Sequence, residues 1–221
     1  MIENNEIACL TNQRRCTLCG SNIVLFCDTD GKSYYRCADC SSILMDPLSL
    51  PSREEERRRY QEHNNDVEDR RYQEFVAPIV NEIQRNFNQE HAGLDFGAGP
   101  GPVVTKLLRD SGFTVELYDP LFWANPEALR TRYDYIACCE VIEHFHSPRK
   151  EFALLHSLLK PGGALYCMTE PYSEDIDFGK WYYKSDQSHV FFYTKDTFEW
   201  VRSHMRFSKL RIKGRLVQFY R

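Results

Sequence analysis

Three acid–base side chains lie close together in the stretch Glu140-Val-Ile-Glu143-His144. They stand at positions i, i+3 and i+4, so one helical turn would bring all three to the same side. Two carboxylates and an imidazole can hold a divalent metal, and an imidazole with a pKa near neutrality can accept a proton. With His189 farther along, Glu143 and His144 are therefore candidate catalytic residues. Alternatively, Glu140 touches a cofactor while Glu143 and His144 cap and pack.

His189 lies in a segment rich in aromatic residues, residues 172–192. Such a segment can line a pocket for an aromatic or otherwise apolar substrate, or it can simply pack. Tyr183 is a further, weaker candidate for proton transfer. Cys138 and Cys139 are expected to be buried strand residues, because no basic residue stands at a spacing that would activate a thiol.

A glycine-rich turn, Gly97-Ala-Gly99-Pro-Gly101, follows the expected strand end Leu94-Asp-Phe96 and precedes a stretch with helical spacing. Glycines let the backbone approach a ligand closely. Asp119 ends the next expected strand about 20 residues later, where a carboxylate can accept hydrogen bonds from ribose hydroxyls. The arrangement predicts a cradle for a nucleotide-type cofactor, although such turns also occur as plain tight turns.

Four motifs occur in order: LDFGAGPG, ELYDP, YDYIACCEVIEHF and LLKPGGALYCMTEP. In this order they resemble the class I S-adenosylmethionine-dependent methyltransferases over residues 91–221. The resemblance implies a doubly wound, Rossmann-like α/β sheet that binds S-adenosyl-L-methionine. The cofactor-binding residues that the motifs and the resemblance indicate are Asp95, Gly97, Ala98, Gly99, Gly101, Asp119, Pro120, Phe122 and Glu140.

One interval is shorter than this family usually has, because only 13 residues separate Asp119 from Tyr133. We expect the third strand of the family's sheet to be absent or vestigial. Phe122 or Trp123 then stacks on the adenine in place of a polar contact, or both are core residues.

The Glu-x-x-Glu-His arrangement is also similar to two narrower groups. Small-RNA 3′-end methyltransferases hold a metal with such a motif and a distant histidine, and quinone O-methyltransferases carry E-V-x-E-H followed by a short loop and proline. The comparison implies a candidate divalent-metal site, separate from the zinc site discussed next, at four residues: Glu140, Glu143, His144 and His189.

Two C-x2-C pairs near the amino terminus are separated by 17 residues. The spacing fits a four-thiolate zinc site with Cys16, Cys19, Cys37 and Cys40 as ligands. Two β-prone segments with a turn between them complete a zinc ribbon with a hairpin. Two disulfides are the alternative, disfavoured in a reducing compartment. Cys9 and Cys27, outside the pairs, are expected to be small apolar residues.

The ribbon could bind nucleic acid, hold a substrate carrier or cap the neighbouring domain. Four basic against six acidic residues precede residue 50, which disfavours nucleic acid and favours a structural role.

A helical connector is expected between the two parts. The run Arg53 to Arg59 mixes charges and predicts a solvated helix face. An amphipathic stripe from Tyr72 to Phe87 predicts a helix against the catalytic domain, with Pro78 implying a kink or two abutting helices. The segment around His63 is either a lid over the site or exposed linker. The expected parts are residues 1–50, 51–90 and 91–221.

Composition sets the remaining limits. The chain has 221 residues, 42% of them hydrophobic, with a net charge of -4, so no overall field attracts a polyanion. No membrane span or secretion signal is visible, which predicts a cytoplasmic protein.

Together these features predict an S-adenosylmethionine-dependent methyltransferase that acts on a small molecule, at oxygen. The alternatives are an RNA methyltransferase guided by the ribbon and a noncatalytic cofactor-binding module. The sequence does not indicate the acceptor or the oligomeric state.

Overall fold

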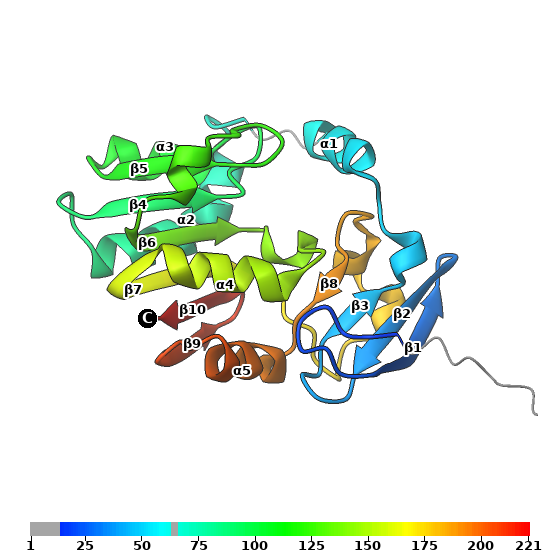
Figure 1. The fold of residues 1–221 in the computed structure, drawn as a ribbon. Coiled ribbons are helices and arrows are strands. Elements are labelled where there is room, and N and C mark those ends of the chain that lie inside the picture. Colours follow the sequence, from blue (N-terminus) through cyan, green and yellow to red (C-terminus); the bar gives the residue numbers. More distant parts are fainter. Residues whose placement is uncertain (1–13, 63–65) are drawn as a thin grey trace, which may run out of the picture.

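The computed structural model describes residues 14–62 and 66–221 and contains two β-sheets. A large lobe carries the six-stranded sheet, and a smaller lobe carries a four-stranded sheet near the amino terminus (Figure 1). In the described ranges no helix is long and apolar enough to cross a bilayer. His63 and Cys9 of the sequence analysis lie outside the described residues.

The large sheet has the strand order β5-β4-β6-β7-β10-β9. Its four parallel strands are β5 (Thr114–Tyr118), β4 (Ala92–Phe96), β6 (Tyr133–Cys139) and β7 (Leu159–Met168). The antiparallel pair β10 (Leu216–Tyr220) and β9 (Lys209–Lys213) completes it. This order confirms the predicted methyltransferase-like α/β sheet.

The third strand of the family's sheet is absent from the described part of the chain, as the sequence predicts. The interval after β5 contains a short 3-10 helix, η2 (Pro126–Leu129), and leads directly into β6. β5 therefore forms an edge of the sheet, as the short interval predicts.

Helices cover both faces of this sheet (Figure 1). α2 (Arg70–Asn86) and α3 (Val103–Asp110) bury their apolar stripes against one face, to which β6 contributes Tyr135 and Ala137. α4 (Pro148–Leu158) and α5 (Lys195–His204) pack on the other face, to which β6 contributes Ile136 and Cys138. This alternation is the two-residue period of a strand buried on both faces.

α2 runs continuously through Pro78, so the possibility of two abutting helices is wrong. The helix begins at an Asp69 cap, whose carboxylate accepts from the Arg71 amide. It packs on α3, β6 and β7, as the amphipathic stripe predicts.

The smaller lobe is built around the cysteine pairs and is here called the cysteine module (residues 14–50). Its strands are β1 (Ile23–Thr29), β2 (Lys32–Cys37) and β3 (Ile43–Met45). The fourth strand of its sheet is β8 (Phe191–Phe192), which belongs to the distant aromatic segment. One hydrophobic core runs from this lobe into the α4 face of the large sheet.

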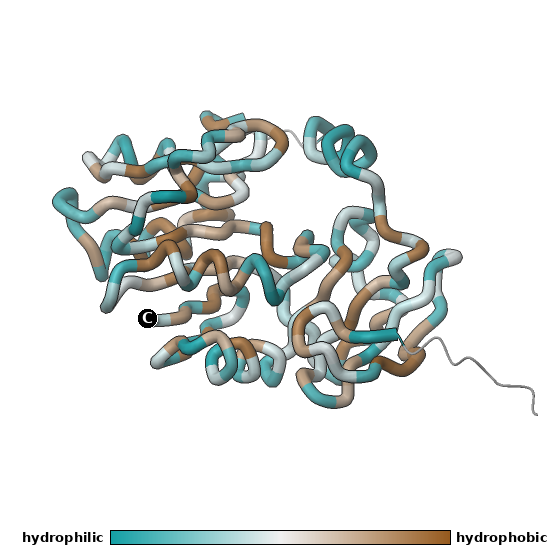
Figure 2. Tube along the Cα trace, in the orientation of Figure 1, coloured by the Kyte–Doolittle hydropathy of each residue, from teal (hydrophilic) through white to brown (hydrophobic). Residues whose placement is uncertain are grey.

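α1 (Arg53–Glu62) bridges the two lobes and buries none of its residues. In Figure 2 this helix is hydrophilic along its length. The remaining helices are short 3-10 turns: η1 (Pro47–Ser49), η3 (Ile142–His144), η4 (Phe178–Lys180) and η5 (Tyr182–Ser185).

Candidate active site

A cavity of about 1200 Å³ opens where the parallel strands of the large sheet end. Open α/β sheets bind their ligands at this edge. One side of the cavity is formed by the ends of β4, β5 and β6, and the other by α1 and the segment from η5 to His189. The predicted residues that line it are Asp95, Gly97, Ala98, Gly99, Gly101, Asp119, Pro120, Glu140, His144 and His189.

The glycine turn needs its glycines for their backbone conformation. Gly97 and Gly99 have φ values of 78° and 62°, in the left-handed region. A Cβ on Gly97 would also lie 2.6 Å from Val141 Cγ1. The amides of Gly97 and Ala98 donate to the Tyr118 carbonyl, at 2.7 and 3.3 Å. These two amides already have a partner within the protein. The turn therefore offers a ligand a backbone surface without side chains.

Asp119 braces this turn from the end of β5. Its Oδ2 accepts from the Gly99 amide at 3.0 Å, and its Oδ1 accepts from the amides of Leu121 and Phe122 at 2.7 and 3.1 Å. A carboxylate has about four acceptor positions. Three are filled, so Oδ2 retains room for one further donor such as a ribose hydroxyl.

Asp95 is 3% exposed at the end of β4, where its Oδ2 accepts from Thr105 Oγ1 at 2.7 Å. Burial raises the pKa of this carboxyl to about 6, although the Thr105 hydrogen bond opposes the shift. Asp95 therefore ties the strand end to the first turns of α3.

Phe122 does not line the cavity, and neither does Trp123. The backbones of Asp119 and Trp123 hydrogen-bond to each other at 3.0 and 3.1 Å, closing a tight turn. The Trp123 indole donates to the Gly99 carbonyl at 2.7 Å, and its side chain is partly exposed. The cavity lining therefore does not support the predicted stacking of either ring on adenine, and Phe122 is left out of the proposed cofactor contacts. Trp123 is 40% exposed, so it is no core residue either.

On the opposite side, Glu143, His144 and His189 come together, with one ligand-type atom from each lying within 4.8 Å of the others. Glu143 is fully buried, and its Oε1 lies 4.0 Å from His144 Nε2 and 3.9 Å from His189 Nε2. Burial raises the pKa of Glu143 to about 7. We call these three residues the histidine cluster.

Hydrogen bonds define the tautomer of both imidazoles. His144 Nδ1 lies 2.8 Å from the Ser188 carbonyl oxygen, and His189 Nδ1 lies 2.6 Å from that of Tyr183. A carbonyl only accepts, so each Nδ1 carries the proton and donates. In the neutral rings each Nε2 then has a lone pair beside Glu143. Metal-binding histidines are commonly oriented in this way.

Glu140 does not join the histidine cluster, which corrects the predicted four-residue set. Its Oε2 accepts from Arg215 Nη2 at 2.6 Å, an ion pair that holds the side chain apart. Its backbone has a left-handed φ of 53°, a strained conformation for a non-glycine residue. Oε1 is buried and has no hydrogen-bond partner in the described part of the chain.

Tyr183 is a hydrogen-bond donor in this arrangement. Its hydroxyl donates to Glu143 Oε1 at 2.6 Å. Burial raises the pKa of Tyr183 well above its ordinary value, so the phenol stays protonated. Cys138 is buried as predicted, whereas Cys139 is only half-buried and lines the cavity, so the prediction of burial is wrong for Cys139. Desolvation raises the pKa of the Cys139 thiol well above its usual range, which is consistent with the prediction that this cysteine is no nucleophile.

α1 contributes a part of the cavity wall that the sequence analysis missed. Glu56 Oε1 lies 2.7 Å from His146 Nε2, and Arg59 Nη2 donates to Asp186 Oδ2 at 2.9 Å. The Tyr60 ring meets His144 edge-on, with centroids 5.2 Å apart. The spacing of residues 56, 59 and 60 marks one helix face, but the mixed charges indicated only a solvated surface.

The four predicted cysteine ligands also form a cluster, with their sulfurs within 4.8 Å of one another. Cys16 Sγ lies 3.6 Å from Cys40 Sγ, and Cys19 Sγ lies 3.3 Å from Cys37 Sγ. These separations exceed the about 2.05 Å of a disulfide, and all four cysteines are free. The disulfide alternative is therefore not what the structure contains.

A family model described as a methyltransferase domain matches residues 68–205, more than half of the chain. The chain belongs to this methyltransferase family. The match confirms the family resemblance found in the motifs. It begins two residues before α2 and ends before β9, so the match takes in that helix and the four parallel strands of the sheet.

Curated relatives agree with this assignment. The chain is 34% identical over 91 residues to a ubiquinone biosynthesis O-methyltransferase of Pectobacterium atrosepticum, covering 41% of this chain and 38% of that protein. A protein of the same name from Serratia proteamaculans is 32% identical over a stretch of the same length, with the same coverage. The match thus spans under two fifths of these relatives' length.

A solved structure supports the fold. The 1,6-didemethyltoxoflavin-N1-methyltransferase of Burkholderia thailandensis superposes with a TM-score of 0.53 at 15% identity, covering 89% of this chain and 98% of that one. Human N-acetylserotonin methyltransferase gives 0.50 at 11% identity, covering 68% and 53%. At such identities the likeness establishes the fold alone.

Proposed function

We propose that this protein transfers a methyl group from S-adenosyl-L-methionine to a small-molecule acceptor, at oxygen. The observation that carries the proposal is a single cavity with two different walls. One wall is the glycine turn braced by Asp119, and the other carries His144 and His189 of the histidine cluster, with the fully buried Glu143 beside them.

The residues present suit the cofactor. The turn exposes backbone without side chains, and Asp119 Oδ2 has room for one more donor. Glu140 Oε1 is a buried acceptor without a partner among the described residues, on the same cavity wall. Asp95, Gly97, Ala98, Gly99, Gly101, Asp119, Pro120 and Glu140 are the proposed cofactor contacts. The cofactor supplies an activated methyl group, so the protein needs mainly to align the acceptor.

The histidine cluster is the proposed proton acceptor. An oxygen nucleophile must lose its proton as the methyl group is transferred. His144 and His189 each hold the Nδ1 proton on a carbonyl and present Nε2 toward Glu143. An imidazole that takes the proton of the methyl acceptor becomes an imidazolium, which a neighbouring carboxylate stabilises. Glu143 itself is oriented by Tyr183 and by Thr169, whose Oγ1 donates at 3.1 Å.

The same cluster has the donor set for a divalent cation, two imidazole nitrogens and one carboxylate. Glu143, His144 and His189 would hold it. When bound, such a cation lowers the pKa of a hydroxyl that reaches it. Metal analysis after affinity purification, with His189→Gln as the variant that should lose the metal, tests this part separately.

The cysteine module is proposed to be a structural zinc ribbon. Four thiolates about 2.3 Å from zinc would be about 3.8 Å apart in a tetrahedron, close to the sulfur distances found. The Ser21 amide lies 3.4 Å from Cys19 Sγ, and it would stabilise that thiolate. One equivalent of zinc, lost in Cys40→Ser, is the expected result of elemental analysis.

Calorimetry with S-adenosylhomocysteine tests cofactor binding without the acceptor. We expect the wild type to bind and Asp119→Asn to bind at least about tenfold more weakly, since hydrogen bonds to a charged group contribute about 1.5–3 kcal/mol. Asp110→Asn, an exposed acid on α3, is the control. Failure of the wild type to bind would defeat the assignment.

Transfer is tested by release of S-adenosylhomocysteine with a panel of phenols, quinols and sugars. Turnover with one of these acceptors is expected. Cofactor binding without transfer to any of them would favour a noncatalytic cofactor-binding module.

A further inference from the structure

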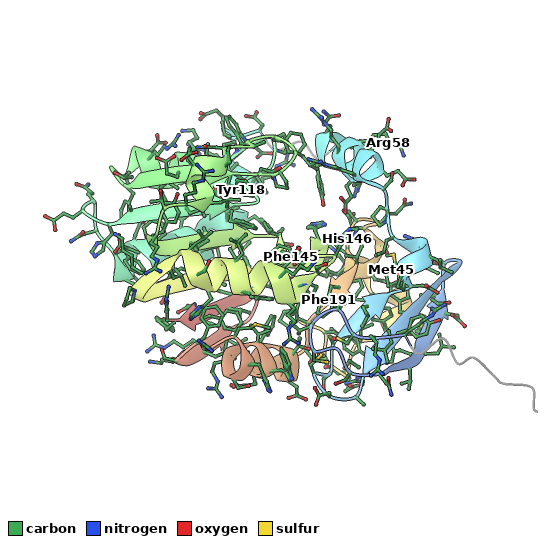
Figure 3. All side chains as sticks on the ribbon, viewed as in Figure 1. Met45, Arg58, Tyr118, Phe145, His146 and Phe191 are labelled. Atoms are coloured by element: carbon green, nitrogen blue, oxygen red, sulfur yellow. The ribbon has the colours of Figure 1, made fainter. Side chains whose placement is uncertain are left out.

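The cysteine module contacts the histidine cluster through backbone hydrogen bonds. β3 pairs with β8, placing Leu44 opposite Phe191. The Met45 amide donates to the Val190 carbonyl at 2.9 Å, and the Val190 amide donates to the Glu143 carbonyl, also at 2.9 Å. Val190 directly follows His189, so one backbone path joins β3 to two members of the cluster. Figure 3 shows Met45 and Phe191 where the two lobes meet.

A second contact comes from the hairpin tip of the module. Asp30, in the turn between β1 and β2, forms an ion pair with Lys184 of η5. Lys184 is only 4% exposed, which is unusual for lysine. Its neighbour Tyr183 donates its hydroxyl hydrogen to Glu143 Oε1, and the Tyr183 carbonyl oxygen accepts from His189 Nδ1.

A third contact is aromatic. Tyr34 of β2 packs edge-to-face on Phe178 and Phe192, with ring centroids 5.0 and 6.0 Å apart. Phe26 of β1 packs on Phe178 at 5.4 Å. Residues 178–192 are therefore held from the module's side at their beginning, middle and end.

The other wall of the cavity, formed by the glycine turn and Asp119 and here called the cofactor wall, is braced from within the large sheet. Its turn is braced by Tyr118 and Asp119 of its own sheet. A change in the module should therefore reach one wall of the cavity and spare the other.

We propose that the cysteine module positions the acceptor side of the active site, with Asp30 and Met45 as positioning residues that keep Tyr183 and His189 on Glu143. The inference rests on the proposed function, since it assigns the module a role in that same site. It gives the module a task inside the methyltransferase and requires no nucleic acid or carrier.

The test is Asp30→Asn. Asparagine tolerates the left-handed φ of 52° at this position, so the turn should be retained while Lys184 loses its ion pair. Asp28→Asn is the matched control, because Asp28 lies in the same hairpin and accepts from the Ser33 hydroxyl of that hairpin at 2.6 Å. Asp30→Glu keeps the carboxylate that pairs with Lys184, so it should retain part of the wild-type behaviour.

The first readout is the imidazole ¹⁵N signal of His189. We expect the wild type and Asp28→Asn to show the Nδ1-protonated form, and Asp30→Asn to show a mixture of tautomers. The second is hydrogen exchange over residues 183–190, which should rise about tenfold in Asp30→Asn as this segment opens locally. Binding of S-adenosylhomocysteine should stay within twofold of the wild type in all variants.

Lys184→Met is a second variant, which removes the buried ammonium group itself, whereas Asp30→Asn leaves that group without its partner. The same rise in hydrogen exchange over residues 183–190 is expected. Unchanged His189 signals and unchanged exchange in both Asp30→Asn and Lys184→Met would overturn the inference. A loss of S-adenosylhomocysteine binding in both variants would overturn it too, because the module would then stabilise the whole protein and not the acceptor side alone. A wild type that fails to bind S-adenosylhomocysteine is a different failure, that of the proposed function.

Discussion

The two walls of the cavity are built in different ways. The cofactor wall takes its parts from consecutive strand ends of one sheet, with the glycine turn after β4 and Asp119 after β5. The acceptor wall collects α1, His144 of η3 and the segment from η5 to His189, and is braced by the cysteine module. A wall made from neighbouring strand ends is rigid and local. A wall made from distant segments depends on each of those segments. The acceptor wall can therefore be altered without changing the cofactor wall.

The sharpest test of this separation is Glu143→Gln. The neutral amide keeps the shape but removes the charge beside both imidazoles, so we expect turnover to fall by about 10²–10⁴-fold, the range of general acid–base catalysis. S-adenosylhomocysteine binding, measured by calorimetry, should be unchanged. Glu199→Gln, an exposed acid on α5, is the control. Loss of cofactor binding in Glu143→Gln would mean that the two walls are not independent.

Asp95→Asn tests the cofactor wall through stability. The folded pKa of about 6 lies above the 3.8 of an ordinary aspartate. The folded state therefore binds more protons at Asp95 between these values, and the contribution of Asp95 to wild-type stability falls as the pH rises from about 4 to 6. The difference amounts to at most about 3 kcal/mol.

Asp95→Asn should lack this loss, so its free energy of unfolding relative to the wild type should increase across that range. Urea titrations at several pH values measure it. Thr105→Val, which removes the opposing hydrogen bond, should steepen the wild-type trend. A pH-independent difference between wild type and Asp95→Asn would contradict the buried, perturbed carboxyl.

Gly97→Ala should weaken the cofactor wall alone. The left-handed φ costs an alanine about 1–2 kcal/mol, and the new Cβ meets Val141 Cγ1. We expect about a tenfold or greater loss of S-adenosylhomocysteine affinity, with the His189 tautomer unchanged. Adding Val141→Ala should relieve the steric part and recover some affinity. No recovery would mean that backbone conformation alone limits the turn.

The smallest expected effect concerns α1. Glu56 raises the pKa of His146, so their attraction is complete below the ordinary histidine pKa and is lost as the pH rises through the raised value. The His146 side chain is 38% exposed, so the pair should contribute less than about 1 kcal/mol.

Protection of residues 53–62 against hydrogen exchange, measured relative to the intrinsic exchange rate at each pH, should therefore fall modestly above neutral pH in the wild type. Glu56→Gln should remove this pH dependence of the protection and leave the glycine turn unaffected. Protection that is equally high at all pH values in both proteins would show that Arg59 and Tyr60 hold the helix without this pair.

The sequence was sufficient where a residue's role follows from its neighbours along the chain. The glycine turn, Asp119 at the next strand end, the missing third strand and the clustering of the four cysteines all depend on spacing within a few residues or on one repeated motif. Backbone conformation and the two-residue period of a strand make such features local.

Tertiary structure alone decided the rest. It left Phe122 and Trp123 out of the cavity lining, in a turn that the Asp119 carboxylate closes. It also separated Glu140 from the histidine cluster through an ion pair with Arg215, 75 residues away. It also brought β8 into the sheet of the cysteine module and Glu56 to His146. Long-range contacts of this kind depend on how folded segments pack, and packing is not encoded in any short stretch of residues.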